Sequence, residues 1–235
     1  MGCPRRKKPE PSMLSHQQSK AFYDRFGKKQ DWQSFYEDVA TGALIRNGDF
    51  GQAAAVLEFG CGTGRFGERL LEEHLPPSAR YVGLDISVTM VALAKERLAR
   101  FGPRAEVRLT DGRPELGFGA AAFDRFVSNY VLDLLTFEDT RKVLQETWRV
   151  LSQGGLLGLT SLTHGFTSIS RVVTSIWTAV HAIQPMLVGG CRPINLLEHV
   201  TGPRWRVRYD EKFSSYGVPS EVLIAEKLKR PSDSE

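Results

Sequence analysis

Three glycines at alternate positions mark the stretch of this chain in which chemistry is most readily expected. Gly60, Gly62 and Gly64 follow a short apolar run over residues 54–59, and an amphipathic pattern begins directly after them. This order predicts a strand, a tight turn and the start of a helix. Glycine suits such a turn because it leaves the backbone open to a ligand and tolerates positive φ. The free amide hydrogens at the start of the helix would then favour the polar or anionic part of a nucleotide-like ligand.

Two acidic residues end neighbouring predicted strands on the same rim as the glycine turn. Asp85 closes residues 80–85, about 20 residues beyond the turn, and Asp111 with Gly112 ends the next apolar run, residues 105–110. A carboxylate at the first of these positions can accept hydrogen bonds from both hydroxyls of a ribose. Either acid alone could be a helix cap or a surface loop residue. Together with the glycine turn, the two acids predict a nucleoside-shaped slot.

The elements that must position these residues follow from an alternation of short apolar runs with amphipathic ones. Such an alternation predicts a mainly parallel sheet covered on both faces. The last two strands are expected to pair with each other, at least one of them antiparallel. The predicted strands cover residues 54–59, 80–85, 105–110, 123–130, 156–162, 205–216 and 221–228.

Helical patterns fill most of the remaining chain. Two helices are expected before the first strand, from Ser15 onward, and their aromatic residues belong either to the core or to a lid over the site. A later helix should begin at Thr136, whose side chain can cap it, and stop at Gly154-Gly155. Residues 168–187 carry an apolar stripe at helical spacing. The expected fold is therefore α/β: a Rossmann-like, doubly wound, seven-stranded, mainly parallel sheet with a reversed C-terminal strand, N-terminal helices and a helical cap insertion after strand five.

Length and composition favour one globular domain. The chain has 235 residues, 41% of them hydrophobic, which is enough for one proper core. We expect a basic disordered tail over residues 1–13 and a single domain over residues 14–235. Within that domain we expect four parts, namely N-terminal lid helices (14–50), a cofactor-binding core (51–162), a substrate cap segment (163–200) and a C-terminal strand pair (201–235).

Charge and cysteine usage exclude several classes of function. The net charge of +4 comes largely from residues 5–8 and 227–230, so the basic character is terminal and no nucleic-acid partner is expected. The three cysteines lack any CxxC spacing, which argues against a metal site or a disulfide scaffold. No apolar run reaches the roughly 18 residues needed to span a bilayer, so we expect a cytoplasmic protein without stable membrane insertion.

In combination the motifs resemble those of the class I S-adenosylmethionine-dependent methyltransferases. The resemblance is closest to the small-molecule branch that includes the quinone-biosynthesis and related type 11 enzymes, and it covers roughly residues 22–162. Its motifs are Glu58-Phe-Gly60-Cys-Gly62-Thr-Gly64, Gly83-Leu-Asp85-Ile-Ser87, Thr110-Asp111-Gly112, Phe123-Asp124-Arg-Phe and Arg149-Val-Leu-Ser-Gln-Gly154-Gly155.

The resemblance implies S-adenosyl-L-methionine as the cofactor and assigns the glycine turn to its methionine moiety. Gly60, Gly62 and Gly64 would admit that moiety, with Glu58 orienting the turn or a water bound to it. Cys61 would lie in the turn as a compact buried thiol. Many relatives carry Asp at the position of Glu58. Glutamate keeps the same charge but has a longer side chain.

The resemblance also assigns residues to the nucleoside. Asp85 would hold the ribose hydroxyls, and Ile86 and Met90 would flank the adenine. Asp111 would accept a hydrogen bond from the adenine amino group, and Gly112 would let the base approach.

Catalysis is expected to depend mainly on placement of the acceptor for in-line displacement at the sulfonium methyl. Asn129 and Tyr130, at the end of strand four, match the position that faces the methyl donor. A dedicated base is not required; the candidates are His164 and Tyr130, followed by Asp133 and His181.

The expected partner is a small-molecule acceptor, and a homodimer is left open. Two alternatives also stay open, a protein methyltransferase and a non-catalytic S-adenosylmethionine-binding protein. A dehydrogenase is disfavoured, because a lone GxGxxG is weak evidence and Asp111 and the reversed C-terminal strand have no role in it.

Overall fold

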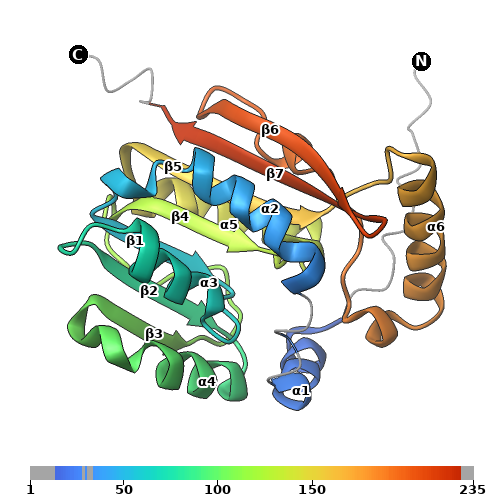
Figure 1. The fold of residues 1–235 in the computed structure, drawn as a ribbon, viewed down its shortest axis with the longest axis horizontal. Helices are drawn as coiled ribbons and strands as arrows, with labels where there is room; N and C mark the ends of the chain where they lie inside the picture. Colours follow the sequence, from blue (N-terminus) through green and yellow to red (C-terminus); the bar gives the residue numbers. More distant parts are fainter. Residues whose placement is uncertain (1–13, 28–29, 31–33, 229–235) are drawn as a thin grey trace, which may run out of the picture.

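A seven-stranded sheet forms the centre of the molecule (Figure 1), which is described here from a computed structural model that covers residues 14–27, 30 and 34–228. The expected tail, residues 1–13, lies outside the described residues. The strands are β1 (Ala55–Phe59), β2 (Arg80–Asp85), β3 (Ala105–Leu109), β4 (Phe123–Asn129), β5 (Leu151–Leu162), β6 (Trp205–Ser215) and β7 (Val218–Lys227). Their order is β3-β2-β1-β4-β5-β7-β6. All neighbouring strands are parallel except β7, which is antiparallel to both β5 and β6, so the predicted fold class is confirmed.

The reversed strand follows from a two-residue turn. Tyr216 (φ 52°) and Gly217 (φ 83°) both have left-handed backbone conformations between β6 and β7. Two successive positive φ values define the tight hairpin turn whose twist matches that of the flanking strands. The hairpin therefore makes β7 antiparallel to β6, and β7 also pairs antiparallel with β5 on its other side.

Helices cover both faces of the sheet. They are α1 (His16–Phe26), α2 (Ser34–Asn47), α3 (Arg65–Arg69), α4 (Val88–Leu98), α5 (Phe137–Val150), α6 (Ser168–Ile183) and α7 (Leu196–His199). Shorter helical turns are η2 (Phe50–Gln52), η3 (Leu70–His74), η4 (Ala99–Arg104), η5 (Leu132–Leu134) and η6 (Pro185–Val188). In Figure 1, α1 lies beyond the arrowheads of the parallel strands and α6 stands at the edge of the molecule. Within the described ranges, no helix is both long and apolar enough to cross a membrane.

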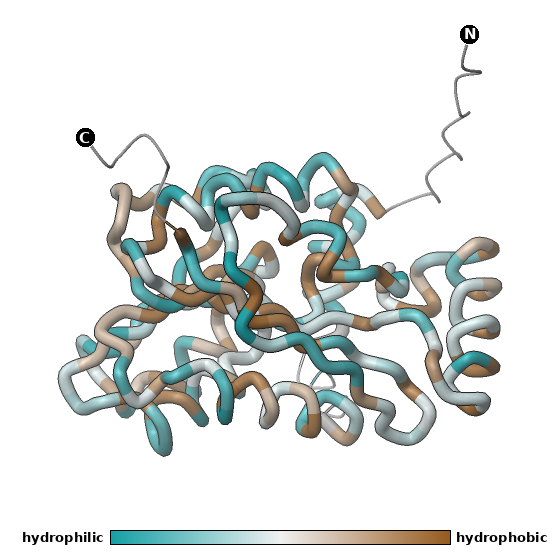
Figure 2. The backbone as a smooth tube through the Cα atoms, turned by 90° about the horizontal axis from the view of Figure 1, so that it is seen from above, coloured by the Kyte–Doolittle hydropathy of each residue, from teal (hydrophilic) through white to brown (hydrophobic). Residues whose placement is uncertain are grey.

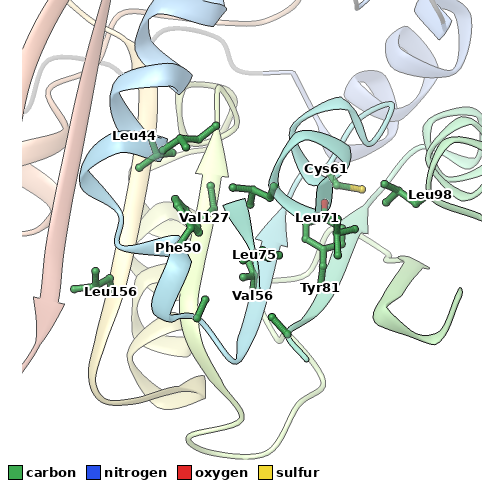
Figure 3. Close-up of a cluster of buried hydrophobic side chains, with 14 of the residues drawn as sticks. Leu44, Phe50, Val56, Cys61, Leu71, Leu75, Tyr81, Leu98, Val127 and Leu156 are labelled. Carbon is green, nitrogen blue, oxygen red and sulfur yellow. The ribbon is translucent and has the colours of Figure 1, made fainter. Parts of the chain in front are cut away.

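Two hydrophobic cores lie on opposite faces of the sheet. Val56 and Tyr81 pack with Leu44 of α2 and with residues of η3 and α4 on one face (Figure 3). Leu57 and Val143 belong to the other face, which α5 and α7 cover. Side chains of a strand alternate between faces, so a central strand between two cores is mostly apolar. Figure 2 shows brown, apolar stretches of these strands in the middle of the molecule, among more polar segments.

The predicted end of the helix that follows Thr136 is wrong. Thr136 does cap α5, because its hydroxyl accepts a hydrogen bond from the Asp139 amide at 3.0 Å. However, α5 ends at Val150 and β5 begins at once, with the buried Leu151 paired to Phe123. Gly154-Gly155 lies inside the strand, where the register with β4 shifts; an irregular pairing is a common use of glycine in sheets.

The helix expected over residues 168–187 is also shorter than predicted. α6 ends at Ile183, and Pro185 opens the separate turn η6. Proline cannot donate the hydrogen bond that would continue the helix, and its ring disfavours helical geometry in the residue before it. The helical spacing of apolar residues continues to Leu187, but the backbone cannot remain helical past Ile183.

Candidate active site

The glycine turn is fixed against the neighbouring strand. The amides of Gly60 and Cys61 both donate to the carbonyl oxygen of Leu84, at 2.8 and 2.9 Å. Gly60 has φ 78°, and a Cβ there would lie 2.3 Å from Val131 Cγ2; Gly62 has φ 52°. Both positions therefore require glycine, because a side chain would be strained at either and would collide with Val131 at Gly60.

Asp85 links the turn to the second strand. Its Oδ2 accepts a hydrogen bond from the Gly62 amide and its Oδ1 accepts one from the Ser87 amide, both at 2.8 Å. Burial raises the pKa of this carboxyl, and the two backbone donors oppose that shift. Each carboxylate oxygen keeps further acceptor capacity, which suits the paired hydroxyls of a ribose.

Glu58 lies at the end of β1 with only 2% of its surface exposed. It accepts hydrogen bonds from Tyr81 Oη at 2.5 Å and from Asn129 Nδ2 at 3.3 Å. Burial raises the pKa of Glu58 to about 7, and both donors act in the opposite direction. Tyr81 thus holds the Glu58 carboxylate from the neighbouring strand β2. No sequence motif pointed to this tyrosine.

Gly67 makes room for Tyr81. A Cβ at Gly67 would lie 2.4 Å from Tyr81 Cζ, so the phenol ring fills the space that any larger residue in α3 would need. The last glycine of the GxGxxG pattern therefore serves packing rather than ligand approach. The third glycine of a dinucleotide-binding fingerprint has the same packing role, so Gly67 does not distinguish the two interpretations of the pattern.

Two adjoining chambers open around these residues and share Tyr23, Gln30, Gly60, Asn129 and Tyr130. The smaller, of about 100 Å³, is here called the apolar chamber; it is lined by residues such as Leu84, Asp85, Ile86, Met90, Gly112 and Leu134. The larger, of about 280 Å³, is called the acidic chamber; it is lined by residues such as Tyr36, Glu37, Asp38, Glu58, Glu72 and Glu73.

Most of the predicted site residues meet at these chambers. The ones that line at least one of them are Glu58, Gly60, Cys61, Gly62, Asp85, Ile86, Met90, Gly112, Asn129 and Tyr130. Gly64 belongs to the turn but lines neither chamber; it precedes α3 with φ 78° and packs against Ala94.

The structure does not bring Asp111 or His164 to the chambers. β3 ends at Leu109, so Asp111 lies in the loop beyond it with 66% of its side chain exposed, 3.2 Å from Arg113 Nε. His164 is exposed in the loop that follows β5, two residues beyond Leu162, whereas the intervening Thr163 is buried and its hydroxyl donates to Glu221 at 2.9 Å. The sequence places both residues correctly at the rim where the strands end. It does not show in which direction their side chains point.

Tyr130 has an unusual backbone and a buried hydroxyl. Its φ is 54°, which is strained for a large side chain, and its amide donates to the carbonyl oxygen of Thr160 at 2.8 Å. The hydroxyl pairs with Ser220 Oγ at 2.8 Å, and burial raises its pKa well above the ordinary value. Tyr130 therefore presents a neutral ring to the chambers, and its role as a base stays a prediction.

Helix α1 covers the apolar chamber. Ser15 caps it through the Gln18 amide, and His16, Ser19 and Tyr23 line the chamber. Asp24 holds α1 against the start of α4, because its Oδ1 accepts from Ser87 Oγ at 2.6 Å. The sequence predicted N-terminal lid helices, but no motif indicated this hydrogen bond between Ser87 and Asp24.

The fold belongs to the doubly wound α/β class, and comparison with known proteins shows which proteins the chain resembles. Residues 56–155 match the family model of a methyltransferase domain. The chain is 32% identical over 124 residues to a carboxy-S-adenosyl-L-methionine synthase from Trichodesmium erythraeum, covering 52% of this chain and 48% of that protein. It is 31% identical over 134 residues to erythromycin 3''-O-methyltransferase from Saccharopolyspora erythraea, covering 57% of this chain and 41% of that protein.

Among solved structures, the (4+2)-cyclase SpnF superposes with a TM-score of 0.71 at 18% identity, over 94% of this chain and 99% of that chain, a likeness of fold alone. The chain spans less than half the length of each of these two curated relatives. Residues 56–155 thus match a methyltransferase domain, and the strand order and the glycine turn agree with the pattern of the class I S-adenosylmethionine-dependent methyltransferases, which this chain resembles.

S-adenosyl-L-methionine is the cofactor of this family, and the residues around the chambers fit it. The bare backbone at Gly60 and Gly62 forms a cradle that a Cβ would obstruct. In the described part of the chain, Asn129 Oδ1 and Gln30 Oε1 are buried without a hydrogen-bond partner, and both residues line the two chambers. Buried acceptors of this kind require donors, which an amino-acid ammonium group can supply.

Proposed function

We propose that the protein transfers a methyl group from S-adenosyl-L-methionine to a small-molecule acceptor by in-line displacement. The observation that carries the proposal is the convergence of Glu58, Asp85 and Asn129 with the bare glycine turn around two connected chambers. The cofactor supplies an electrophilic methyl group when it is bound, so little further activation is needed. The protein then acts mainly by holding the acceptor in line, which can lower the barrier by several kcal/mol, on the order of 7 to 11 at most.

The residues divide between the two chambers according to their chemistry. In the apolar chamber, Asp85 would hold the ribose hydroxyls while Ile86 and Met90 flank the base. In the acidic chamber, Glu58 and Asn129 would bind the amino-acid end of the cofactor. Asp111 would contact the base only after a rearrangement of its loop, since it now faces Arg113.

The geometry does not favour either Tyr130 or His164 as a general base. Burial keeps the Tyr130 hydroxyl protonated and paired with Ser220, and His164 is exposed outside both chambers. Positioning is therefore proposed as the main contribution to catalysis, and neither Tyr130 nor His164 is proposed to activate the acceptor.

The proposal extends to the organisation and setting of the chain. Residues 14–50 would act as lid helices, residues 51–162 as the cofactor-binding core, residues 163–200 as the substrate cap and residues 201–235 as the closing strand pair. We also propose a cytoplasmic setting without a nucleic-acid partner or stable membrane insertion, with a homodimer left open.

Calorimetric titration with S-adenosyl-L-methionine tests the cofactor site directly. Asp85→Ala should weaken binding roughly 10- to 100-fold, because it removes charged hydrogen bonds worth about 1.5–3 kcal/mol. Glu138→Gln is the control, since Glu138 is 68% exposed and paired with Lys142 on the far face of the sheet. Labelled-methyl transfer to a metabolite extract, read by mass spectrometry, then tests the activity. Binding that is absent, or that Asp85→Ala leaves unchanged, would refute the proposal.

A further inference from the structure

We propose that the acceptor is a small organic amine, bound in its ammonium form between the Glu37 carboxylate and the rings of Tyr36 and Tyr130. This inference rests on the proposed methyl transfer, because it assigns the acceptor of the same site. The subsite is the part of the acidic chamber that adjoins the apolar chamber. The three residues line the acidic chamber together with Gly60 and Asn129, and Tyr130, Gly60 and Asn129 also line the apolar chamber. An acceptor held there would lie beside the residues that would face the methyl donor.

Charge is the first argument for an ammonium group. Among the described residues, the acidic chamber is lined by two arginines and six carboxylates, the latter being Glu37, Asp38, Glu58, Glu68, Glu72 and Glu73. Arg65 is bound to Asp38 through two hydrogen bonds of 2.7 and 2.8 Å, and Arg69 lies 3.8 Å from Glu73. Arg100, outside the lining, pairs with Glu68 at 3.1 Å and with Glu72 at 2.7 Å. Among the described lining residues, the acids outside these ion pairs are Glu37 and Glu58, and their negative charge favours a cation over a carboxylate or phosphate acceptor.

Aromatic rings form the second part of the subsite. The rings of Tyr36 and Tyr130 meet edge to face with centroids 5.8 Å apart, and Phe35 packs on Tyr36 at 5.1 Å. Burial raises the pKa of both phenols, so they stay neutral and their rings can attract a cation. Tyr36 and Tyr130 are 7% and 9% exposed, which means that a cation beside them would be largely removed from water.

Glu37 is placed to bind the cation and to accept its proton. Thr41 Oγ1 donates to the Glu37 carbonyl oxygen at 2.9 Å, which fixes that turn of α2 next to Tyr36. Burial raises the pKa of Glu37 to about 7. The neighbouring Tyr36 hydroxyl and the charge of Arg65 oppose the shift, whereas the charges of Asp133 and Asp38 add to it.

A carboxyl group with this pKa can exchange a proton at neutral pH. The acceptor ammonium would pass one proton to the Glu37 carboxylate and become a neutral amine. Its nitrogen lone pair would form the new N–C bond as the C–S bond of the sulfonium breaks, the electron pair remaining on sulfur. The positive charge thus moves from sulfur to the methylated nitrogen, and Glu37 releases its proton to solvent.

The experiment compares three probes of similar shape on the full chain saturated with S-adenosylhomocysteine: benzylamine, benzyl alcohol and benzoate. At pH 7.5 we expect benzylamine to bind at least tenfold more tightly than benzyl alcohol, and benzoate to bind most weakly. Glu37→Gln should reduce the preference for the amine to less than threefold while changing the S-adenosylhomocysteine affinity less than twofold. Tyr36→Phe, which keeps the ring, should retain most of the preference, and Glu138→Gln should behave as wild type.

The outcomes separate the inference from the proposed function. Equal binding of the amine and the alcohol by the wild-type protein would overturn the inference whether or not the variants fold. So would a Glu37→Gln variant that keeps the amine preference but binds S-adenosylhomocysteine more weakly, because Glu37 would then serve the cofactor. Methylation of lysine peptides without binding of free amines would replace the small amine by a protein acceptor. A wild-type protein that binds no S-adenosylhomocysteine would instead refute the proposed function.

Discussion

Cofactor binding should release a proton from Glu58, and Tyr81 should set the pH at which it does so. The Glu58 carboxyl is 2% exposed, with a pKa raised to about 7 by burial. If it pairs with the ammonium of the cofactor, it must be ionised in the complex. Because half of the free protein is then protonated at pH 7, the affinity at pH 6 should be about tenfold lower than at pH 8.

Tyr81→Phe removes the 2.5 Å hydrogen bond that stabilises the ionised form of Glu58. A hydrogen bond to a charged group contributes about 1.5–3 kcal/mol, which corresponds to a rise of about 1–2 units in the pKa of the acid. The affinity at pH 7 should therefore fall roughly 5- to 50-fold, and the deficit should shrink as the pH rises toward 9. Neither Asn129, the other donor to Glu58, nor the nearby Asp85 is altered by this change.

Calorimetric titration with S-adenosylhomocysteine from pH 6 to 9, in two buffers that differ in ionisation enthalpy, measures both the affinity and the protons released. Tyr209→Phe is the matched control, because Tyr209 donates to Glu211 on the surface of β6. Glu58→Gln should abolish the proton release; release that persists in this variant would point to Glu37. An affinity independent of pH between 6 and 8, or a Tyr81→Phe deficit of the same size at every pH, would refute the reasoning.

Three further changes probe the packing around the site. Gly67→Ala should lower the free energy of unfolding by about 1–3 kcal/mol in denaturant titrations, because its Cβ would lie 2.4 Å from Tyr81 Cζ. Ala normally stabilises a helix relative to Gly, so a loss of stability would reveal this clash. Adding Tyr81→Leu should recover part of the loss. Asp24→Ala should expose α1 to limited proteolysis and weaken cofactor binding several-fold, since it removes the 2.6 Å contact with α4; unchanged cleavage would contradict this. Tyr130→Phe should cost about 1 kcal/mol of stability by thermal unfolding, through loss of the bond to Ser220, while cofactor binding persists.

The parts of the fold that were predictable are those set by the pattern of a few neighbouring residues. The strand and turn around Gly60 were predictable because apolar spacing and glycine choice act over a few residues. The reversed strand was predictable from the turn at Gly217. The end of α5 was not, since the glycines that normally stop a helix lie inside β5, where pairing with β4 decides the backbone.

The site was predictable where the motif itself contacts the ligand and not where another segment supplies the contact. Asp85 and Asn129 reach the chambers because the carboxyl ends of parallel strands share one rim. Tyr81 and Glu37 were missed because their contacts cross between elements: Tyr81 reaches Glu58 from β2, and Glu37 enters from a helix upstream of the sheet. His164 shows the opposite error, since its position on the rim was correct but its side chain points to solvent.

Three carboxyl groups near the site have a pKa raised to about 7, but they are not equivalent. Burial is the main cause for Glu37, Glu58 and Asp133 alike. Glu37 and Glu58 line the acidic chamber, so a bound cation could compensate the cost of ionising them. Asp133 is fully buried and accepts instead from the Leu162 amide at 3.3 Å, with its Oδ1 unpartnered within the described residues. Since a cavity that holds two such acids favours cationic ligands, the ammonium of the cofactor at Glu58 and that of the acceptor at Glu37 would each stabilise a charge that the empty fold disfavours.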